Sequence, residues 1–154
     1  MAPETEFLFT THINLQPAID GGPTPAGHRL TVYVTGGSFE GPGFRGKVLP
    51  GGGDWLSLRA DGSGAIDVRI WLETDDGARI YVTYGGRLVV PPELLAQAMD
   101  FDNAQALDPA LYYFRTQPLF ETGHPKYQHL NNLVTIGVGR LGHGGVTYDV
   151  HVVK

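Results

Sequence analysis

Hydrophobic and polar residues alternate along most of this chain with a period of two, which is the pattern of half-buried β-strands. The alternation first covers residues 6–15, where Phe9 and Ile13 share one face, and it returns over residues 30–35. Between these segments, residues 16–27 contain three prolines and three glycines, so we expect a loop there.

Glycine-rich turns separate the later alternating segments and predict a meander of antiparallel strands. The turns Asp61-Gly62-Ser63-Gly64 and Asp75-Asp76-Gly77 each join two such segments, as hairpin connections do. Gly142-His143-Gly144-Gly145 is expected to close a final hairpin. The predicted strands of this part of the chain cover residues 55–58, 66–73, 80–84, 112–116, 133–139 and 146–153.

One segment, residues 91–99, predicts a short helix. Pro91 and Pro92 fit a first helical turn, and Glu93 favours the positive end of the helix dipole. Leucine and alanine then recur at helical spacing. A second short turn is expected at Asp108-Pro109-Ala110.

The pattern as a whole predicts an all-β fold formed by one domain over residues 1–154. Eight or more antiparallel strands in 154 residues must protect their edges, and closing the sheet into a barrel removes those edges. We therefore favour a single antiparallel β-barrel with one short helix near residues 91–99, and a β-sandwich is the alternative. A barrel of about eight strands encloses side chains or one small ligand.

Composition and charge exclude several classes of function. The 11 basic and 16 acidic residues give a net charge of -5, and they are interspersed, so we expect no nucleic-acid partner. The chain has no cysteine, which removes disulfide and thiolate chemistry and is compatible with a reducing cytoplasm. No signal peptide or membrane-length apolar stretch is present, so we expect a cytoplasmic protein that does not enter a membrane.

The common catalytic and cofactor motifs are missing or lack their context. Gly41, Gly43 and Gly46 spell the dinucleotide pattern, but no helix follows to hold a pyrophosphate. The six histidines lack the spacing of metal ligands, and no serine lies in a nucleophile elbow. We expect neither a metal nor another cofactor.

Polar residues inside the segment 66–74 are the most informative feature for function. Val68, Ile70 and Leu72 share one face, whereas Asp67, Arg69, Trp71 and Glu73 share the other. The polar face either meets solvent with weak surface ion pairs or lines a ligand cavity, where an indole beside charged groups would bind a polar ligand. If the polar face lines a cavity, the strand faces that carry Tyr81, Tyr113 and Arg115 point into the same barrel lumen.

Several blocks of the sequence resemble one known family. The blocks are "TGGSFEGPGFRGKVLPGGGDW", "TDDGARIYV" and "YYFRTQPLFETG", followed by Tyr127, Leu130 and Asn131. These blocks are similar to the sequence blocks of the domain of unknown function 3237 family. They occur in the same order, and the similarity covers nearly the whole chain. The resemblance implies a calycin-like or allene-oxide-cyclase-like barrel that is often oligomeric. It also implies kinship with fungal polyketide cyclases that need no cofactor and close an oxygen ring by adding a hydroxyl across a prenyl alkene.

The resemblance also implies a set of site residues. Asp54 and Trp55 leave the glycine-rich block together, at the start of a strand. Trp71 and Glu73 match the family less clearly, because relatives vary there. The positions that match the family blocks are Asp54, Trp55, Asp67, Arg69, Tyr81, Tyr113, Arg115, Glu121 and Asn131.

Our leading hypothesis is a cofactor-independent cyclase, isomerase or hydratase that acts on a hydrophobic, oxygenated small molecule. Asp54 or Glu121 would be the acid or base, and Arg69 and Arg115 would bind the anion of the substrate. Trp55, Asp67, Trp71, Tyr81, Tyr113 and Asn131 would bind the rest of the substrate. A ligand carrier or sensor and a structural protein with a filled lumen are the alternatives. We expect a homo-oligomer, a dimer or larger.

Overall fold

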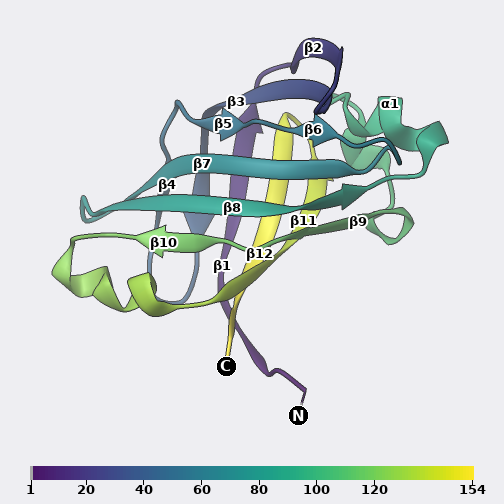
Figure 1. Cartoon of the computed structure of the whole chain (residues 1–154). Coiled ribbons are helices and arrows are strands. Elements are labelled where there is room, and N and C mark those ends of the chain that lie inside the picture. Colours follow the sequence, from purple (N-terminus) through teal and green to yellow (C-terminus); the bar gives the residue numbers. More distant parts are fainter. Residues whose placement is uncertain (1) are drawn as a thin grey trace.

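The computed structural model describes residues 2–154 and shows a closed antiparallel barrel (Figure 1). Eight strands form its wall: β1 (Thr5–Leu15), β3 (Gly27–Glu40), β4 (Arg45–Val48), β7 (Gly64–Thr74), β8 (Arg79–Val89), β9 (Tyr113–Thr116), β11 (Thr135–Gly142) and β12 (Gly145–Val153). Their order is β8-β9-β11-β12-β1-β3-β4-β7, and β7 pairs with β8 to close the circle. The predicted barrel is therefore confirmed and the sandwich is excluded.

Four short strands extend the wall: β2 (Ile19–Thr24), β5 (Gly53–Asp54), β6 (Ser57–Leu58) and β10 (Leu119–Glu121). The loop predicted over residues 16–27 was wrong, because β2 lies there and pairs with β3. Backbone hydrogen bonds hold this edge strand, and no apolar face is buried to reveal it in the sequence. The three predicted turns all connect antiparallel strands as expected.

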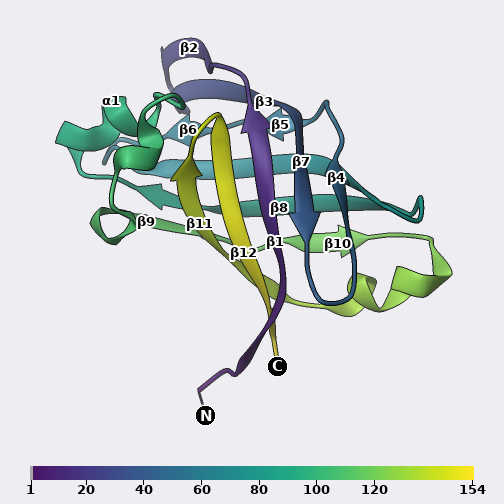
Figure 2. The same cartoon turned by 180° about the vertical axis from the view of Figure 1, so that it is seen from behind.

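Short helical segments occupy two parts of the barrel far from each other (Figures 1 and 2). The predicted helix is confirmed as the 3₁₀ turn η1 (Pro92–Leu94) continued by α1 (Leu95–Ala98). Two further 3₁₀ turns, η2 (Ala104–Ala106) and η3 (Pro109–Leu111), follow it, and η3 is the second predicted turn. The remaining 3₁₀ helix, η4 (Pro125–Asn132), lies against β10.

The inward face of the wall is almost entirely apolar. Along β7, Ile66, Val68, Ile70 and Leu72 are all buried, whereas the residues between them face outward. An eight-stranded barrel has an interior that side chains can fill, so burying the aliphatic face gives the larger hydrophobic stabilisation. This choice of face decides where the candidate site residues lie.

One end of the barrel is sealed by aromatic rings. Phe9 makes edge contacts with Phe39, Phe44 and Phe120, with ring centroids 5.4 to 5.9 Å apart. Tyr127 of η4 packs on Phe44 at 5.8 Å and is 4% exposed. These rings fill most of the space, and the cavity beside Phe9 has a volume of only about 20 Å³.

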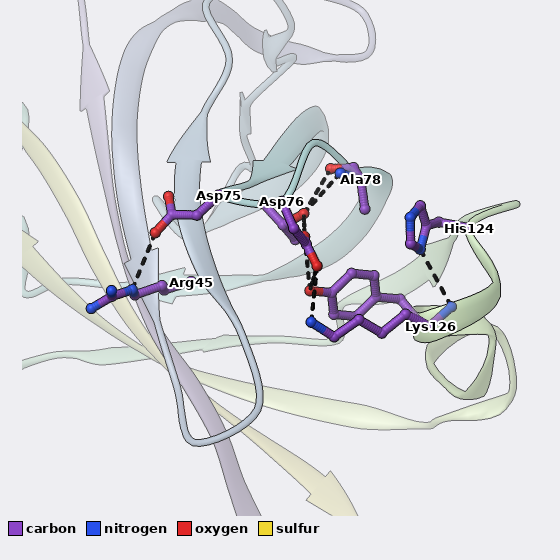
Figure 3. Close-up of polar contacts among 8 residues, drawn as sticks. Arg45, Asp75, Asp76, Ala78, His124 and Lys126 are labelled. Atoms are coloured by element: carbon purple, nitrogen blue, oxygen red, sulfur yellow. Dashed lines mark hydrogen bonds and ion pairs between the residues drawn. The ribbon is translucent and has the colours of Figure 1, made fainter.

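A polar clamp built on Asp76 ties η4 to the turn between β7 and β8. Figure 3 shows the Asp76 carboxylate facing Lys126, whose Nζ donates to it at 2.9 Å. The hydroxyls of Tyr127 and Thr74 also donate to this carboxylate. The hydrogen bond from Thr74 and the pairing with Lys126 hold the pKa of Asp76 well below its ordinary value of 3.8.

Replacing Asp76 with asparagine is expected to lower the melting temperature at neutral pH by a few degrees. A carboxyl whose pKa is lowered by folding stabilises the protein above its unfolded-state pKa, and this contribution is lost as pH falls through the folded-state pKa. The variant should therefore lose less stability than wild type on acidification below about pH 4. Thermal unfolding at several pH values measures this difference.

Asp75→Asn is the matched control for that prediction. Asp75 is the preceding residue and pairs with Arg45 at 3.1 Å, but both side chains are about two-thirds exposed. Such a surface pair contributes little. Equal losses in the two variants would contradict a special role for the Asp76 clamp.

Candidate functional site

The glycine-rich segment that precedes Asp54 places this carboxylate on the inner side of the wall. β5 is inserted between β3 and β7, so that Asp54 lies opposite Val32 on one side and Val68 on the other. Val68 in turn lies opposite Tyr84 of β8. Directly opposed residues share a face of the sheet, so these four side chains form one row that points into the lumen.

A cavity of about 50 Å³ lies beside this row, at the end of the barrel that carries α1. The segment around α1 closes it with Ala98, Met99 and Phe101. This volume has room for about three or four water molecules or a short hydrocarbon chain. Asp54 is the one charged residue among those that line it; the others include Ile13, Leu56, Ile66, Leu88, Phe114, Leu141, Tyr84 and Tyr148.

The apolar surroundings change the acidity of Asp54. Burial raises the pKa of its carboxyl from 3.8 to about 6, although the backbone N–H of Asp67, which donates to Oδ1 at 2.9 Å, opposes this change. The residue as a whole remains partly exposed, so it can exchange its proton with solvent. A carboxyl with this pKa can hold or release a proton near neutral pH.

Two tyrosines face each other within the lumen. Tyr84 projects from β8 and Tyr148 from β12, and their rings meet edge to face with centroids 5.5 Å apart. Burial raises the pKa of both phenols above the ordinary value, and the negative charge of Asp54 acts in the same direction. Both hydroxyls therefore remain protonated near neutral pH and can donate hydrogen bonds in the cavity.

Most residues that the sequence assigned to the lumen lie on the outer face instead, so that prediction of their placement was wrong. The reason is the burial of the aliphatic face of each strand, which turns the polar face outward. Asp67 and Arg69 form a half-exposed ion pair at 3.3 Å, and Glu73 pairs with Lys47 and Arg79. The residues that face outward are Asp67, Arg69, Trp71, Tyr81, Tyr113, Arg115 and Glu121.

Some of these outward residues still lie together. Trp71, Tyr81 and Glu121 are neighbours across β7, β8 and β10, and the two rings are 5.0 Å apart. With Asn131 they line an outer groove of about 610 Å³. The Asn131 side chain accepts from the Thr122 N–H and donates to the Thr122 carbonyl. These two hydrogen bonds tie η4 to the end of β10.

Trp55 lies outside the cavity as well. The Arg69 guanidinium is 5.5 Å from the centroid of its ring, and the ring is not among the groups that line the lumen cavity. Of the ten predicted site residues, Asp54 is the one that the structure brings to the cavity. Catalytic or binding roles for the other residues stay predictions.

Tyr84 and Tyr148 were not predicted as site residues from the sequence. Each tyrosine lies on the aliphatic face of its strand. Ile80 and Val82 precede Tyr84 on that face, and Val146 and Val150 flank Tyr148. A tyrosine on an otherwise aliphatic strand face was the available signal. It marks a hydroxyl that folding carries into the core.

Other kinds of site find little support in the described chain. Within residues 2–154, no three His, Asp or Glu side chains gather closely enough to hold a metal ion. Over the same range, no helix has the length and apolar character needed to span a membrane. The predicted cytoplasmic location and the predicted homo-oligomer stay predictions.

The fold and site together define a small antiparallel β-barrel with one carboxyl group beside a small, apolar cavity in its lumen. The chain belongs to the family described as Protein of unknown function (DUF3237), which matches residues 3–153. A UPF0311 protein of Rhodopseudomonas palustris strain TIE-1 is 37% identical over 150 residues, covering 97% of this chain and 96% of the relative. The crystal structure of a conserved protein of unknown function from Rhodopseudomonas palustris, 34% identical, superposes with a TM-score of 0.92 and covers 100% of this chain and 99% of the other.

One relative carries the name of an activity. The hydroalkoxylation enzyme phnH of Penicillium herquei is 32% identical over 136 residues, covering 88% of this chain and 73% of that protein. The barrel of this chain thus has a fungal enzyme among its relatives.

Proposed function

We propose that this chain is a cofactor-independent enzyme that adds a hydroxyl group across an alkene within a hydrophobic, oxygenated substrate. Cyclisation is the reaction class favoured, and isomerisation and hydration use the same acid chemistry. The observation that carries the proposal is a single carboxyl group with a raised pKa in an apolar cavity. The fungal hydroalkoxylation enzyme supports it, since that name describes the addition of an O–H bond across a double bond.

In the proposed reaction, Asp54 is the general acid. Its carboxyl proton is transferred to one alkene carbon, with the π electron pair forming the new C–H bond. The substrate oxygen bonds to the other alkene carbon, and its proton returns to the Asp54 carboxylate. The product is an isomer of the substrate, so the reaction needs no oxidant, reductant or external group.

The surroundings of Asp54 suit this chemistry. The aliphatic wall from Val32 and Val68 excludes water that would otherwise compete for a carbocation. The Tyr84 and Tyr148 rings present electron-rich faces that stabilise positive charge, and their hydroxyls can orient the substrate oxygen. Arg69, Arg115 and Glu121 face away from the cavity and take no part in the proposal.

The size of the cavity limits what enters it. At about 50 Å³ the cavity accepts a short alkenyl chain, while an aromatic ring would remain near the cap formed by Met99 and Phe101. The cap is held by a hydrogen bond from the Gly144 N–H to the Phe101 carbonyl at 2.8 Å. We infer that a substrate carries its alkene on a flexible side chain.

Incubation with an ortho-prenylated phenol in deuterated water tests the proposal. Wild type should form a cyclic ether of unchanged elemental composition that carries one carbon-bound deuterium, detected by mass spectrometry and proton NMR. The rate should fall as pH rises through about 6, because the acid must be protonated. Tyr148→Phe, which keeps the ring and removes the hydroxyl, separates packing from hydrogen bonding.

Two other outcomes of the same experiment would contradict the proposal. Binding of the phenol without any conversion, together with a ligand retained through purification in native mass spectrometry, would support a carrier and contradict the enzyme. A product without carbon-bound deuterium would contradict protonation of the alkene by an exchangeable acid.

A further inference from the structure

Two arginines face each other on the outer side of the barrel wall, opposite to the lumen. Arg87 of β8 pairs in register with Arg115 of β9, and both residues are exposed. Like charges that lie directly opposite on neighbouring strands repel and destabilise a sheet. An anion bound between the two guanidinium groups would relieve this repulsion.

No ion pair of Arg87 or Arg115 with a carboxylate occurs within residues 2–154. Asp67 lies opposite Gly85, two residues before Arg87, but its carboxylate is engaged by Arg69 at 3.3 Å. The positive charge of the pair is thus uncompensated at this point of the wall, although the whole chain has a net charge of -5.

Both guanidinium groups are held in place. Arg87 Nη1 donates to the Gly86 carbonyl and Arg115 Nη1 donates to the Phe114 carbonyl, each at 2.8 Å. The Arg115 guanidinium also stacks over Tyr113, 4.9 Å from the ring centroid. These contacts use one donor of each group and leave the other N–H groups for a ligand. Because the side chains are already ordered, binding loses less conformational entropy.

The space beside this pair has the composition of a small-molecule site. A hollow of about 610 Å³ is lined by both arginines, with Gly85, Gly86, Gln117 and the exposed apolar side chains of Tyr113 and Ile136. Gly85, which is exposed on this face, has no side chain to cover the backbone there. A flat aromatic wall and an aliphatic side chain lie next to two cations.

We propose that this arginine hollow binds a small organic oxyanion. Its carboxylate or phosphate group is held between Arg87 and Arg115, whose planar guanidinium groups match two oxygens at once. Its flat apolar body lies against Tyr113 and Ile136. The site is separate from the Asp54 cavity, because the two open on opposite faces of the same wall.

Calorimetric titration with phenyl phosphate, benzoate and inorganic phosphate tests the site in the full chain. We expect phenyl phosphate to bind with a dissociation constant of about 0.1–1 mM, weakening as salt is raised. Arg87→Gln and Arg115→Gln should each weaken binding by about tenfold or more. Tyr113→Ala should weaken phenyl phosphate and leave inorganic phosphate unchanged, and circular dichroism checks that each variant is folded.

Two variants keep this test independent of the proposed function. Arg45→Gln removes an exposed arginine elsewhere and should leave binding unchanged, as should Asp54→Asn. Absence of binding in wild type, or equal affinity of the Arg87 variant and wild type, would overturn the proposal. So would equal affinity for phosphate and phenyl phosphate, or a salt-sensitive dimer that dissociates when Arg87 or Arg115 is replaced, since the hollow would then be a protein interface.

Discussion

Replacing Asp54 with asparagine is expected to lower the turnover number by about 10²–10⁴-fold, the usual contribution of a positioned general acid. The amide has nearly the same shape, so it can still accept the hydrogen bond from the Asp67 N–H, but it cannot supply a proton to the alkene. Steady-state kinetics with the ortho-prenylated phenol measures the loss. Glu121→Gln is the control, because the carboxylate of Glu121 lies on the outer face of β10.

The activities of the two variants show which of the two carboxyl groups is the acid. The sequence left Asp54 and Glu121 as equal candidates for the acid, whereas the structure places Asp54 alone in the cavity. Full activity of the Asp54→Asn variant would contradict the proposed mechanism. A loss in Glu121→Gln of similar size would instead direct attention to the outer groove beside Trp71 and Tyr81.

The same substitution is expected to change stability in a pH-dependent way that needs no substrate. The Asp54 pKa is raised by folding, from 3.8 to about 6, so its contribution to stability is complete below pH 3.8 and is lost as pH rises through about 6. The loss amounts to about 3 kcal/mol at higher pH. Asparagine does not titrate, so the variant should gain about 1–2 kcal/mol relative to wild type near pH 8 after desolvation of its amide.

Urea unfolding of both proteins at about pH 4 and about pH 8 measures that difference. The relative stability of the variant should rise between the two pH values. A difference that is the same at both would mean that the Asp54 carboxyl is not desolvated in the folded protein.

The second large effect is expected at Gly52, which sets the position of β5. Its φ is +75°, and a Cβ added there would lie 2.2 Å from the Arg69 carbonyl oxygen. That contact is with backbone, so β5 or β7 would have to move. We expect Gly52→Ala to lower the free energy of unfolding by about 3 kcal/mol or more, from the strained conformation together with the clash.

Gly51→Ala is the matched control, because Gly51 has a φ of +92° but no atom within 4 Å of an added Cβ. Its cost should be limited to the left-handed conformation, about 1–2 kcal/mol. Urea unfolding of the two variants gives both values. Equal costs would contradict the close packing of Gly52 against the β7 backbone.

Much of the fold follows from short-range features of the sequence. The alternation in residues 66–73 and the turn at Asp75-Asp76-Gly77 predict β7, β8 and their pairing, and the structure agrees. The helical segment at 91–99 follows from Pro91, Pro92 and the spacing of the apolar residues. β2 was missed because an edge strand that buries little has no period-two apolar signal.

Less of the candidate site could be predicted. Asp54 was predicted because it follows a glycine-rich turn at the start of a strand. That prediction needs only residues that are neighbours in the sequence. Arg87, which faces Arg115 across two strands, was not identified, since only the register of β8 and β9 reveals the pair. Tyr84 and Tyr148 are 64 positions apart in the chain and meet only because the barrel closes.

The sequence by itself determined that this protein is a chain of short antiparallel strands, because alternation and turn chemistry act over a few residues. It also determined which side chains share a strand face. Only the tertiary structure decided which face points inward. Closing eight strands into a barrel leaves a narrow interior. Burying aliphatic side chains there stabilises the fold more than enclosing arginines and carboxylates would. That decision left Asp54 with two tyrosines in the lumen and placed the charged, aromatic faces outside.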